Sequence, residues 1–382
     1  MLDRPNQNSS PKAVGFAIAL LTLSAAVLTR RESLGKQSRT WDNNHEAMPQ
    51  ADLPHSAKAA HNAELREQGR GRRATSPTDI PPRGWKDILV RVFHEISDDR
   101  VVAIAAAVTF YGLLALFPAV AAFVSLYGLF ADPATINEHL AVLGQVLPGG
   151  ALEIISDQVK RVASAGETKL GFAFVAGLGI ALWSANGGMK ALFDALNVVY
   201  DEEEKRGFVR LNGTSLTFTL GAVLIALVAL GAMVGLPALL AHMSWGKAAD
   251  WAISILRWPA LLLAVMTGLA LLYRFGPSRE KARWRWITPG SVTAAVLWLI
   301  ASMAFSWYAA NFGSYNKTYG SLGAIIGFMT WMWISTIVIL LGAELNAEAE
   351  HQTARDTTEG PETPMGSRGA RVADEVASGA RA

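Results

Sequence analysis

The run VVAIAAAVTFYGLLALFPAVAAFVSLYGLFA at residues 101–131 contains no charged side chain. At 1.5 Å per residue, 31 helical residues extend about 46 Å. The hydrocarbon core of a bilayer is only about 30 Å thick, so such a helix is long enough to cross it. Because it exceeds that thickness, we expect it to tilt, to kink near Pro118 or to emerge from the bilayer. This run therefore predicts a membrane protein.

The composition of the whole chain agrees with this prediction. Its 382 residues are 51% hydrophobic and 17% charged, with a net charge of +2. Soluble domains typically carry about 25% charged residues. The sequence has no cysteine, which excludes a disulfide scaffold, an iron–sulfur cluster and a cysteine nucleophile.

Five further apolar runs follow the first and predict a core of six transmembrane helices. Its first helix is the run 101–131, and the other five cover residues 170–189, 211–241, 251–273, 287–310 and 321–343. Amphipathic helices are expected at the membrane surface around Trp85–Ile96 and over residues 132–169 and 188–206. Gly323 and Gly327 have the spacing that allows two helices to approach closely. The predicted fold class is all-α, polytopic, with interfacial helices.

The remaining segments divide the chain into domains. Residues 1–29 contain the uncharged run 13–29, which we interpret as an extra N-terminal transmembrane anchor; a cleaved signal peptide is the alternative. Residues 30–82 are polar and predicted to be a disordered linker. Residues 83–351 form the six-helix membrane domain, and residues 352–382 are predicted to be a disordered tail.

Lysine and arginine predict the orientation. The flank 274–286 carries five of them, whereas the connections 242–250 and 311–320 carry one each. Cytoplasmic flanks accumulate these residues. The linker and the tail are therefore both expected in the cytoplasm, with the anchor running from outside to inside.

The sequence lacks the motifs of the common enzyme classes. It has no P-loop, no H-E-x-x-H motif and no G-x-S-x-G nucleophile elbow. We therefore expect no catalytic residue, no metal site and no cofactor, and the chain is predicted not to be an enzyme. The basic residues lie at membrane flanks, so no nucleic-acid partner is expected.

Polar side chains at membrane depth are the candidates for function. Those that could line a cavity or act in gating are Tyr111, Asn186, Asp194, Asn197, Tyr308 and Glu344. Three have a simpler alternative: Asp194 as a solvated side chain, Asn186 as a helix terminator and Glu344 as a hydrated helix end. Asn197 and Glu344 are both expected near cytoplasmic helix ends, where the carboxylate could accept a hydrogen bond from the amide.

Three blocks of the sequence resemble the YihY/virulence factor BrkB family of bacterial inner-membrane proteins. They are Ala106–Leu129, Trp183–Tyr200 and the stretch from Pro289 through Thr318–Ala324 to Leu341–Asn346. The resemblance covers residues 83–351, and Thr109 and Ala115 depart from the pattern. It implies six transmembrane helices, a cytoplasmic amphipathic entry helix and no cofactor. Members are often labelled ribonuclease BN after a tRNA-processing activity.

Our leading interpretation is a transporter-like inner-membrane protein that handles a small or lipid-like solute. The alternative is a non-catalytic envelope factor that acts through protein partners or lipid organisation, and the least favoured is a tRNA-processing ribonuclease. Membrane lipids are the expected partners. The sequence does not decide whether the chain also forms a homo-oligomer.

Overall fold

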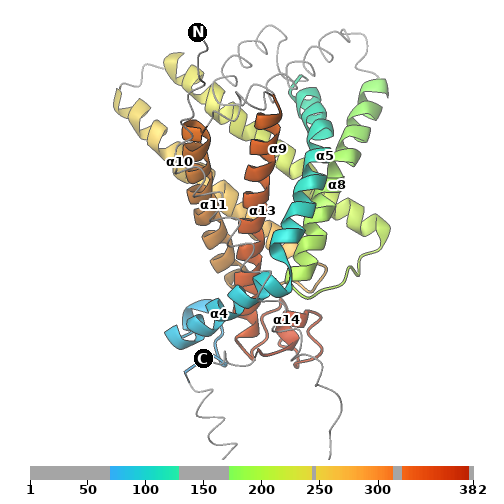
Figure 1. Cartoon of the computed structure of the whole chain (residues 1–382), viewed down its shortest axis with the longest axis vertical. Helices are drawn as coiled ribbons and strands as arrows, with labels where there is room; N and C mark the ends of the chain where they lie inside the picture. The colour runs from blue at the N-terminus through green and yellow to red at the C-terminus, as the bar shows by residue number, and fades with distance from the viewer. Residues whose placement is uncertain (1–68, 129–171, 243–246, 313–320, 378–382) are drawn as a thin grey trace, which may run out of the picture. The chain divides into compact units, whose positions relative to one another are not determined.

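The computed structural model describes residues 69–128, 172–242, 247–312 and 321–377, and this part of the chain is helical (Figure 1). Its long helices are α5 (Val101–Gly128), α8 (Phe172–Val199), α9 (Phe208–His242), α10 (Lys247–Phe275), α11 (Trp284–Phe312) and α13 (Ser321–His351). Shorter elements are η1 (Pro77–Asp79), α4 (Pro82–Asp98) and α14 (Arg371–Asp374). These residues form no strand, only one isolated bridge between Ala282 and Thr358. The all-α prediction is confirmed.

The described residues of each predicted run fall within one long helix, but this does not give the number of membrane crossings. Within the described residues, three segments are long and apolar enough to cross a membrane: Phe208–Val228, Trp284–Ala309 and Ile325–His351. The pair α4 and α5, bent by 60°, makes a fourth if it is counted as one broken span. Six crossings therefore stay a prediction. The anchor at 1–29, residues 30–68 of the linker and the whole segment 132–169 lie outside the described residues.

Helix α8 differs from the sequence prediction. A span at 170–189 followed by a separate amphipathic helix at 188–206 was expected, and the structure has one continuous helix that ends at Val199. Apolar and amphipathic stretches can share one helix when its second half leaves the apolar layer and packs on protein. Residues 200–207 then connect α8 to α9.

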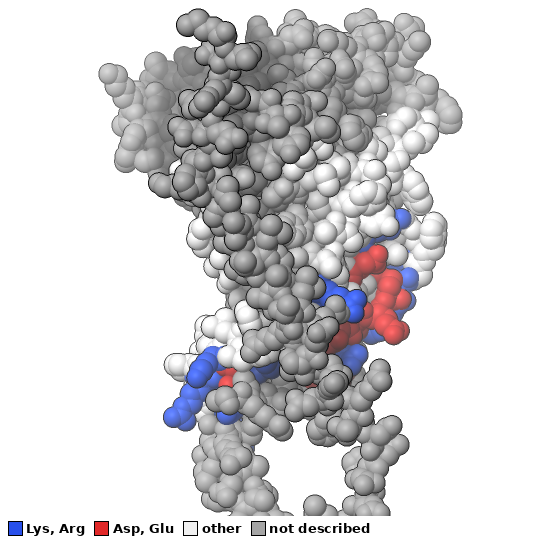
Figure 2. Space-filling view, viewed as in Figure 1, with Lys and Arg blue, Asp and Glu red and all other residues white. Residues whose placement is uncertain are grey.

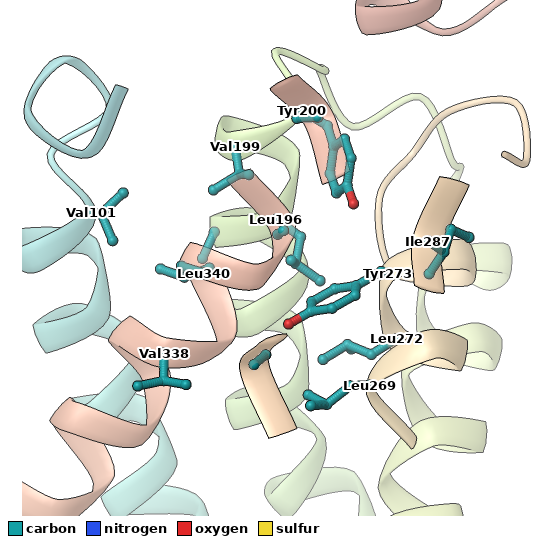
Figure 3. Close-up of a cluster of buried hydrophobic side chains, with 14 of the residues drawn as sticks. Val101, Leu196, Val199, Tyr200, Leu269, Leu272, Tyr273, Ile287, Val338 and Leu340 are labelled. Atoms are coloured by element: carbon teal, nitrogen blue, oxygen red, sulfur yellow. The ribbon is translucent and has the colours of Figure 1, made fainter. Parts of the chain in front are cut away.

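The buried core joins α5, α8, α10, α11 and α13 (Figure 3). Tyr273 of α10 is fully buried, and its hydroxyl donates to the Ile339 carbonyl of α13 at 2.8 Å. Leu196 and Val199 of α8 and Leu340 of α13 are also buried in this cluster. The core thus lies towards the C-terminal ends of α8, α10 and α13.

Two glycines bring α11 and α13 close together. A Cβ on Gly290 would collide with the Gly342 carbonyl oxygen and the Asn346 side chain, and a Cβ on Gly342 would meet the Tyr273 hydroxyl. Asn346 Oδ1 accepts a hydrogen bond from the Gly290 amide at 2.8 Å. By contrast, a Cβ on Gly327 would meet open space, so the predicted close contact at that residue is wrong.

One end of the helices is polar. We define the polar end as α4 and residues 200–207, 276–283 and 352–377. Most of the charged side chains visible in Figure 2 lie towards this end, and the described surface beyond them is largely uncharged.

The tail at the polar end is ordered, which corrects the prediction for residues 352–377. The Glu359 amide donates to the Lys281 carbonyl at 2.8 Å, and the Arg283 amide donates to the Thr357 carbonyl at 2.9 Å. Gln352, Thr353 and other polar tail residues are buried. The tail has few apolar residues, so its order comes from hydrogen bonds to other segments, which its own composition does not reveal.

Residues 69–82 of the predicted linker are ordered in a similar way. Arg70 forms an ion pair with Asp87 of α4, and its carbonyl accepts from Gln352 Nε2 at 2.7 Å. Ala74 and Ile80 are buried in a second core cluster with Trp286. The prediction of a disordered linker is thus corrected for these residues.

The close approach of α11 and α13 predicts that Gly290→Ala destabilises the protein. The added methyl group must push the helices apart, and overpacking typically costs about 1–3 kcal/mol. Gly327→Ala is the matched control and should change stability little, because its methyl group enters open space. Thermal unfolding of the purified protein in detergent measures both. Equal melting temperatures for the two variants would contradict this packing.

Candidate functional site

A polar cluster lies in the seam between α8 and α9. Asn186 of α8 has no exposed surface, and its side chain contacts two residues of α9. Its Nδ2 lies 3.4 Å from Asn212 Oδ1, and its Oδ1 accepts from Thr219 Oγ1 at 3.2 Å. Asn186 lies within α8, so the alternative of a helix terminator is wrong. We call these residues, together with Ser215 and Lys190, the seam cluster.

Lys190 brings a positive charge to the seam cluster. Its Nζ donates to Asn212 Oδ1 at 3.2 Å and lies 5.7 Å from the centre of the Trp183 ring. Asp194, one turn further along α8, is exposed and interacts with Lys190 electrostatically. The Asn212 amide oxygen is neutral, so no residue of the seam cluster itself balances the charge of Lys190.

Apolar surface borders the seam cluster. Phe208 and Val209 at the start of α9 are 71% and 83% exposed, and Trp183 is 49% exposed. The rings of Trp183 and Phe208 lie 6.3 Å apart. The seam therefore combines a cation and amide groups with open apolar surface. Such a surface suits an amphipathic ligand.

The connection 200–207 fixes where α9 begins. Arg206 donates to the Gly276 carbonyl at 2.8 Å and pairs with Glu204 at 2.7 Å. Burial alone would raise the pKa of Glu204, but hydrogen bonds from Arg206 and Asn197 outweigh it and hold the pKa at about 2. Glu204 is therefore ionised at neutral pH, and its negative charge balances the positive charge of Arg206.

Asn197 positions backbone at the polar end. Its Oδ1 accepts from the Ser278 amide at 2.7 Å, and its Nδ2 donates to Glu204 at 3.2 Å. The hypothesis that Asn197 pairs with Glu344 fails, because Asn197 bonds to these two residues whereas Glu344 faces Asp99. Both residues remain buried polar groups in different surroundings.

The last two turns of α13 carry three buried carboxyls, and each has a different partner. Glu350 pairs with Arg279 at 2.6 Å and accepts from the Thr357 hydroxyl at 2.7 Å. The side chains of Arg279 and Glu350 are 1% and 0% exposed. The guanidinium of Arg279 also stacks on the Tyr200 ring, with 4.3 Å to its centre.

The other two carboxyls of α13 are those of Glu348 and Glu344. Glu348 forms an ion pair with Arg91 of α4. Glu344 is 1% exposed, and its carboxyl lies within hydrogen-bonding reach of the Asp99 carboxyl. The alternative that Glu344 is a hydrated helix end is therefore wrong.

The other candidate residues lie apart from these contacts. Tyr111 is 51% exposed on α5, where its ring makes an edge contact with Phe110. Tyr308 lies on α11 with its ring near Phe305. Asp194 lies at the margin of the seam cluster. A cavity or gating role for these three stays a prediction.

Sequence reasoning missed most of these partners. A signal for the seam existed: Asn212, Ser215 and Thr219 recur at three- and four-residue steps, which places them on one face of α9. In the sequence, Arg279 stands out only as one of the basic residues that predict the orientation in the membrane. Asp99 gave no signal, because its partner is far away in sequence.

The described residues show no group of three or more histidine, aspartate or glutamate side chains arranged to hold a metal ion. Several of the described acids instead pair with an arginine, a lysine or a hydroxyl group. The expectation that the chain needs no metal and no cofactor stays a prediction.

Comparisons with known proteins agree with a membrane protein. Residues 92–366 match the family described as virulence factor BrkB. The chain is 33% identical over 251 residues to "Putative ribonuclease-like protein YfkH" of Bacillus subtilis, a match that covers 64% of this chain and 88% of that protein. No solved structure matches.

Two further relatives carry the description UPF0761 membrane protein. The one from Nitrosospira multiformis is 28% identical over 282 residues, covering 72% of this chain and 62% of that relative. The one from Vibrio parahaemolyticus is 27% identical over 277 residues, covering 70% of this chain and 83% of the relative.

The buried ion pair predicts a large effect of Arg279→Met on stability. The substitution leaves Glu350 buried without a counter-charge, and breaking such a pair costs about 3–5 kcal/mol. The double variant Arg279→Met/Glu350→Gln should recover part of this loss. Arg355→Met is the control, since the Arg355–Glu362 pair is 53% and 63% exposed and contributes about 1 kcal/mol or less. Thermal unfolding gives all four values, and an equal loss in both single variants would contradict the burial.

Proposed function

Because the chain belongs to the virulence factor BrkB family of membrane proteins, we propose that it is transporter-like and handles a small or lipid-like solute at the seam cluster. The observation that carries this proposal is the seam itself. Lys190 and Asn212 offer a charge and an amide to a polar head group, while Trp183 and Phe208 offer apolar surface beside them. A lipid-like solute has both parts.

The charge of Lys190 favours an anionic head group. Charge-assisted hydrogen bonds are stronger than neutral ones, and aromatic rings suit the boundary between lipid and water. A phosphate beside Lys190 would leave its acyl chains against the exposed apolar faces of α8 and α9. The phosphate of a phospholipid therefore fits the seam cluster.

We also propose that the protein lies in the bacterial inner membrane with the polar end in the cytoplasm. The support is the concentration of lysine and arginine at residues 274–286, within and beside the polar end. The chain has no cysteine, so a single cysteine at position 281 reports its own side of the membrane. Labelling of that cysteine from the periplasm would reverse the orientation.

A second function, an envelope factor that organises lipid, has one observation in its favour. A shallow groove on α4 is lined by Trp85, Leu89 and Phe93 with Lys86 at its side. Leu89 and Phe93 are 58% and 66% exposed. This face suits a membrane surface, and it needs no solute path.

A ribonuclease activity is the least favoured function. Its support is the name of the Bacillus relative, while phosphodiester hydrolysis generally relies on metal ions or a positioned acid–base pair. We propose that the chain is not an enzyme.

Transport can be tested with a fluorescent phospholipid. The purified protein is reconstituted into vesicles of phosphatidylethanolamine and phosphatidylglycerol containing a trace of NBD-labelled phosphatidylglycerol. Dithionite, added outside, bleaches only the probe of the outer leaflet. We expect the wild-type protein to carry probe from the inner leaflet outwards, so that bleaching exceeds the outer-leaflet share.

Variants of the seam cluster should slow this movement. Lys190→Gln removes the charge and Asn186→Leu removes an amide, and each loss of about 1 kcal/mol corresponds to about a fivefold slower rate. Lys205→Gln is the control, because Lys205 pairs with Glu202 outside the seam. Bleaching equal to that of protein-free vesicles would contradict the lipid-like solute. A normal rate in both seam variants would remove the seam cluster from the proposal.

A further inference from the structure

The three carboxyls at the end of α13 differ in the charge of their partners. Glu348 has Arg91 and Glu350 has Arg279 as ion-pair partners. Glu344 instead faces Asp99, another carboxyl. Two ionised carboxylates at hydrogen-bonding distance repel each other strongly in a buried place.

A second observation concerns one of the two carboxyl oxygens of Glu344. Its Oε1 is buried and has no hydrogen-bond partner in the described part of the chain. The side chain is 1% exposed, so water does not solvate it freely. A buried carboxylate oxygen without a partner is costly, whereas a protonated carboxyl removes the charge.

The groups around Asp99 and Glu344 also favour a bound positive charge. The groups that face the pair are acidic or neutral, and they come from α4, from α13 and from the start of the connection 200–207: Glu95, Asp98, Glu348, Tyr200 and Asp201. The nearby guanidinium of Arg91 is held by Glu348 and by Gln352. The arrangement around Glu344 therefore calls for a positive charge.

We propose that Asp99 and Glu344 form a proton-binding site in which one proton is shared between the two carboxyls. One carboxyl donates an O–H hydrogen bond, and the other accepts it. The proton site stands by itself; its role as the coupling ion of transport rests on the proposed function.

The Asp99–Glu344 pair lies at the bend between α4 and α5, so a change in its charge can act on this bend. Asp99 lies at the end of α4, and Arg100 follows with a left-handed φ of 54°. The two helices bend by 60° there. Loss of the shared proton would set two negative charges against each other between the end of α4 and α13. Protonation therefore links α13 to the α4–α5 corner.

The titration of Asp99 makes it the acceptor of the shared proton at neutral pH, with the proton on the carboxyl of Glu344. Burial and the neighbouring acids raise the pKa of Asp99 to about 6, although its hydrogen bond with Glu344 acts in the opposite direction. The folded protein thus binds more protons than the unfolded chain between the ordinary pKa of 3.8 and about 6. The protonated Asp99 carboxyl contributes to the stability of the folded protein below this interval. This contribution is lost as the pH rises through it.

Infrared spectroscopy of the purified full-length protein tests the site directly. A protonated carboxyl has a C=O stretching band that a carboxylate lacks. We expect such a band in the wild-type protein at neutral pH, its loss in Glu344→Gln and a shifted band in Asp99→Asn. Glu362→Gln is the control, because Glu362 is 63% exposed and pairs with Arg355 in the tail, and it should leave the band unchanged.

Several outcomes would overturn the proposal. A wild-type protein without the band, or a band that persists unchanged in both Glu344→Gln and Asp99→Asn, removes the proton site. A band that disappears when sodium is added at constant pH makes the ligand a sodium ion instead. The wild-type measurement holds even if a variant fails to fold. A band in a protein that moves no labelled lipid supports the proton site and contradicts only the transport proposal.

Discussion

The buried ion pair between Arg279 and Glu350 is the interaction on which the polar end depends. Neither side chain is more than 1% exposed, so each charge would be strongly destabilising without the other. Glu350 belongs to the last turn of α13, Arg279 to the segment after α10, and Thr357, which donates to Glu350, to the tail. One carboxylate therefore fixes three segments that are distant in sequence. The stacking of Arg279 on Tyr200 adds the start of the connection 200–207, and the planar guanidinium can make both contacts at once.

The seam between α8 and α9 follows from this anchored end. Asn197 bonds to the Ser278 amide beside Arg279, and Arg206 bonds to the Gly276 carbonyl. The connection 200–207 is thereby held against the segment 276–283, and α9 begins where Phe208 reaches Trp183. Asn212 then lies beside Asn186 within α8 rather than beyond its end. The placement of a polar cluster next to apolar surface is thus a consequence of contacts made at the polar end.

The helices were predictable from the sequence, and the contacts between them were not. In lipid every backbone amide must bond within its own segment, so an uncharged run such as 101–131 specifies a helix without reference to anything else. The order of residues 352–377 depends on partners such as Arg283 and Lys281, which no property of the tail reveals. Glu344 illustrates the same limit within the candidate site. Its position after an apolar run suggested a hydrated helix end, and its burial depends on Asp99, which precedes it by more than two hundred residues.

The ordered tail is the most direct consequence of the account, because the Arg279–Glu350 pair is buried beneath segments that the tail contacts. Amide hydrogen exchange of the full chain in detergent or nanodiscs measures it residue by residue. The Arg283 and Glu359 amides donate to carbonyl oxygens across the polar end, so both should exchange slowly, together with the Ala354 amide. Arg279→Met should raise the exchange rate at these sites, while the exposed-pair variant Arg355→Met should leave it unchanged. Fast exchange throughout residues 352–377 in the wild-type protein would contradict the account.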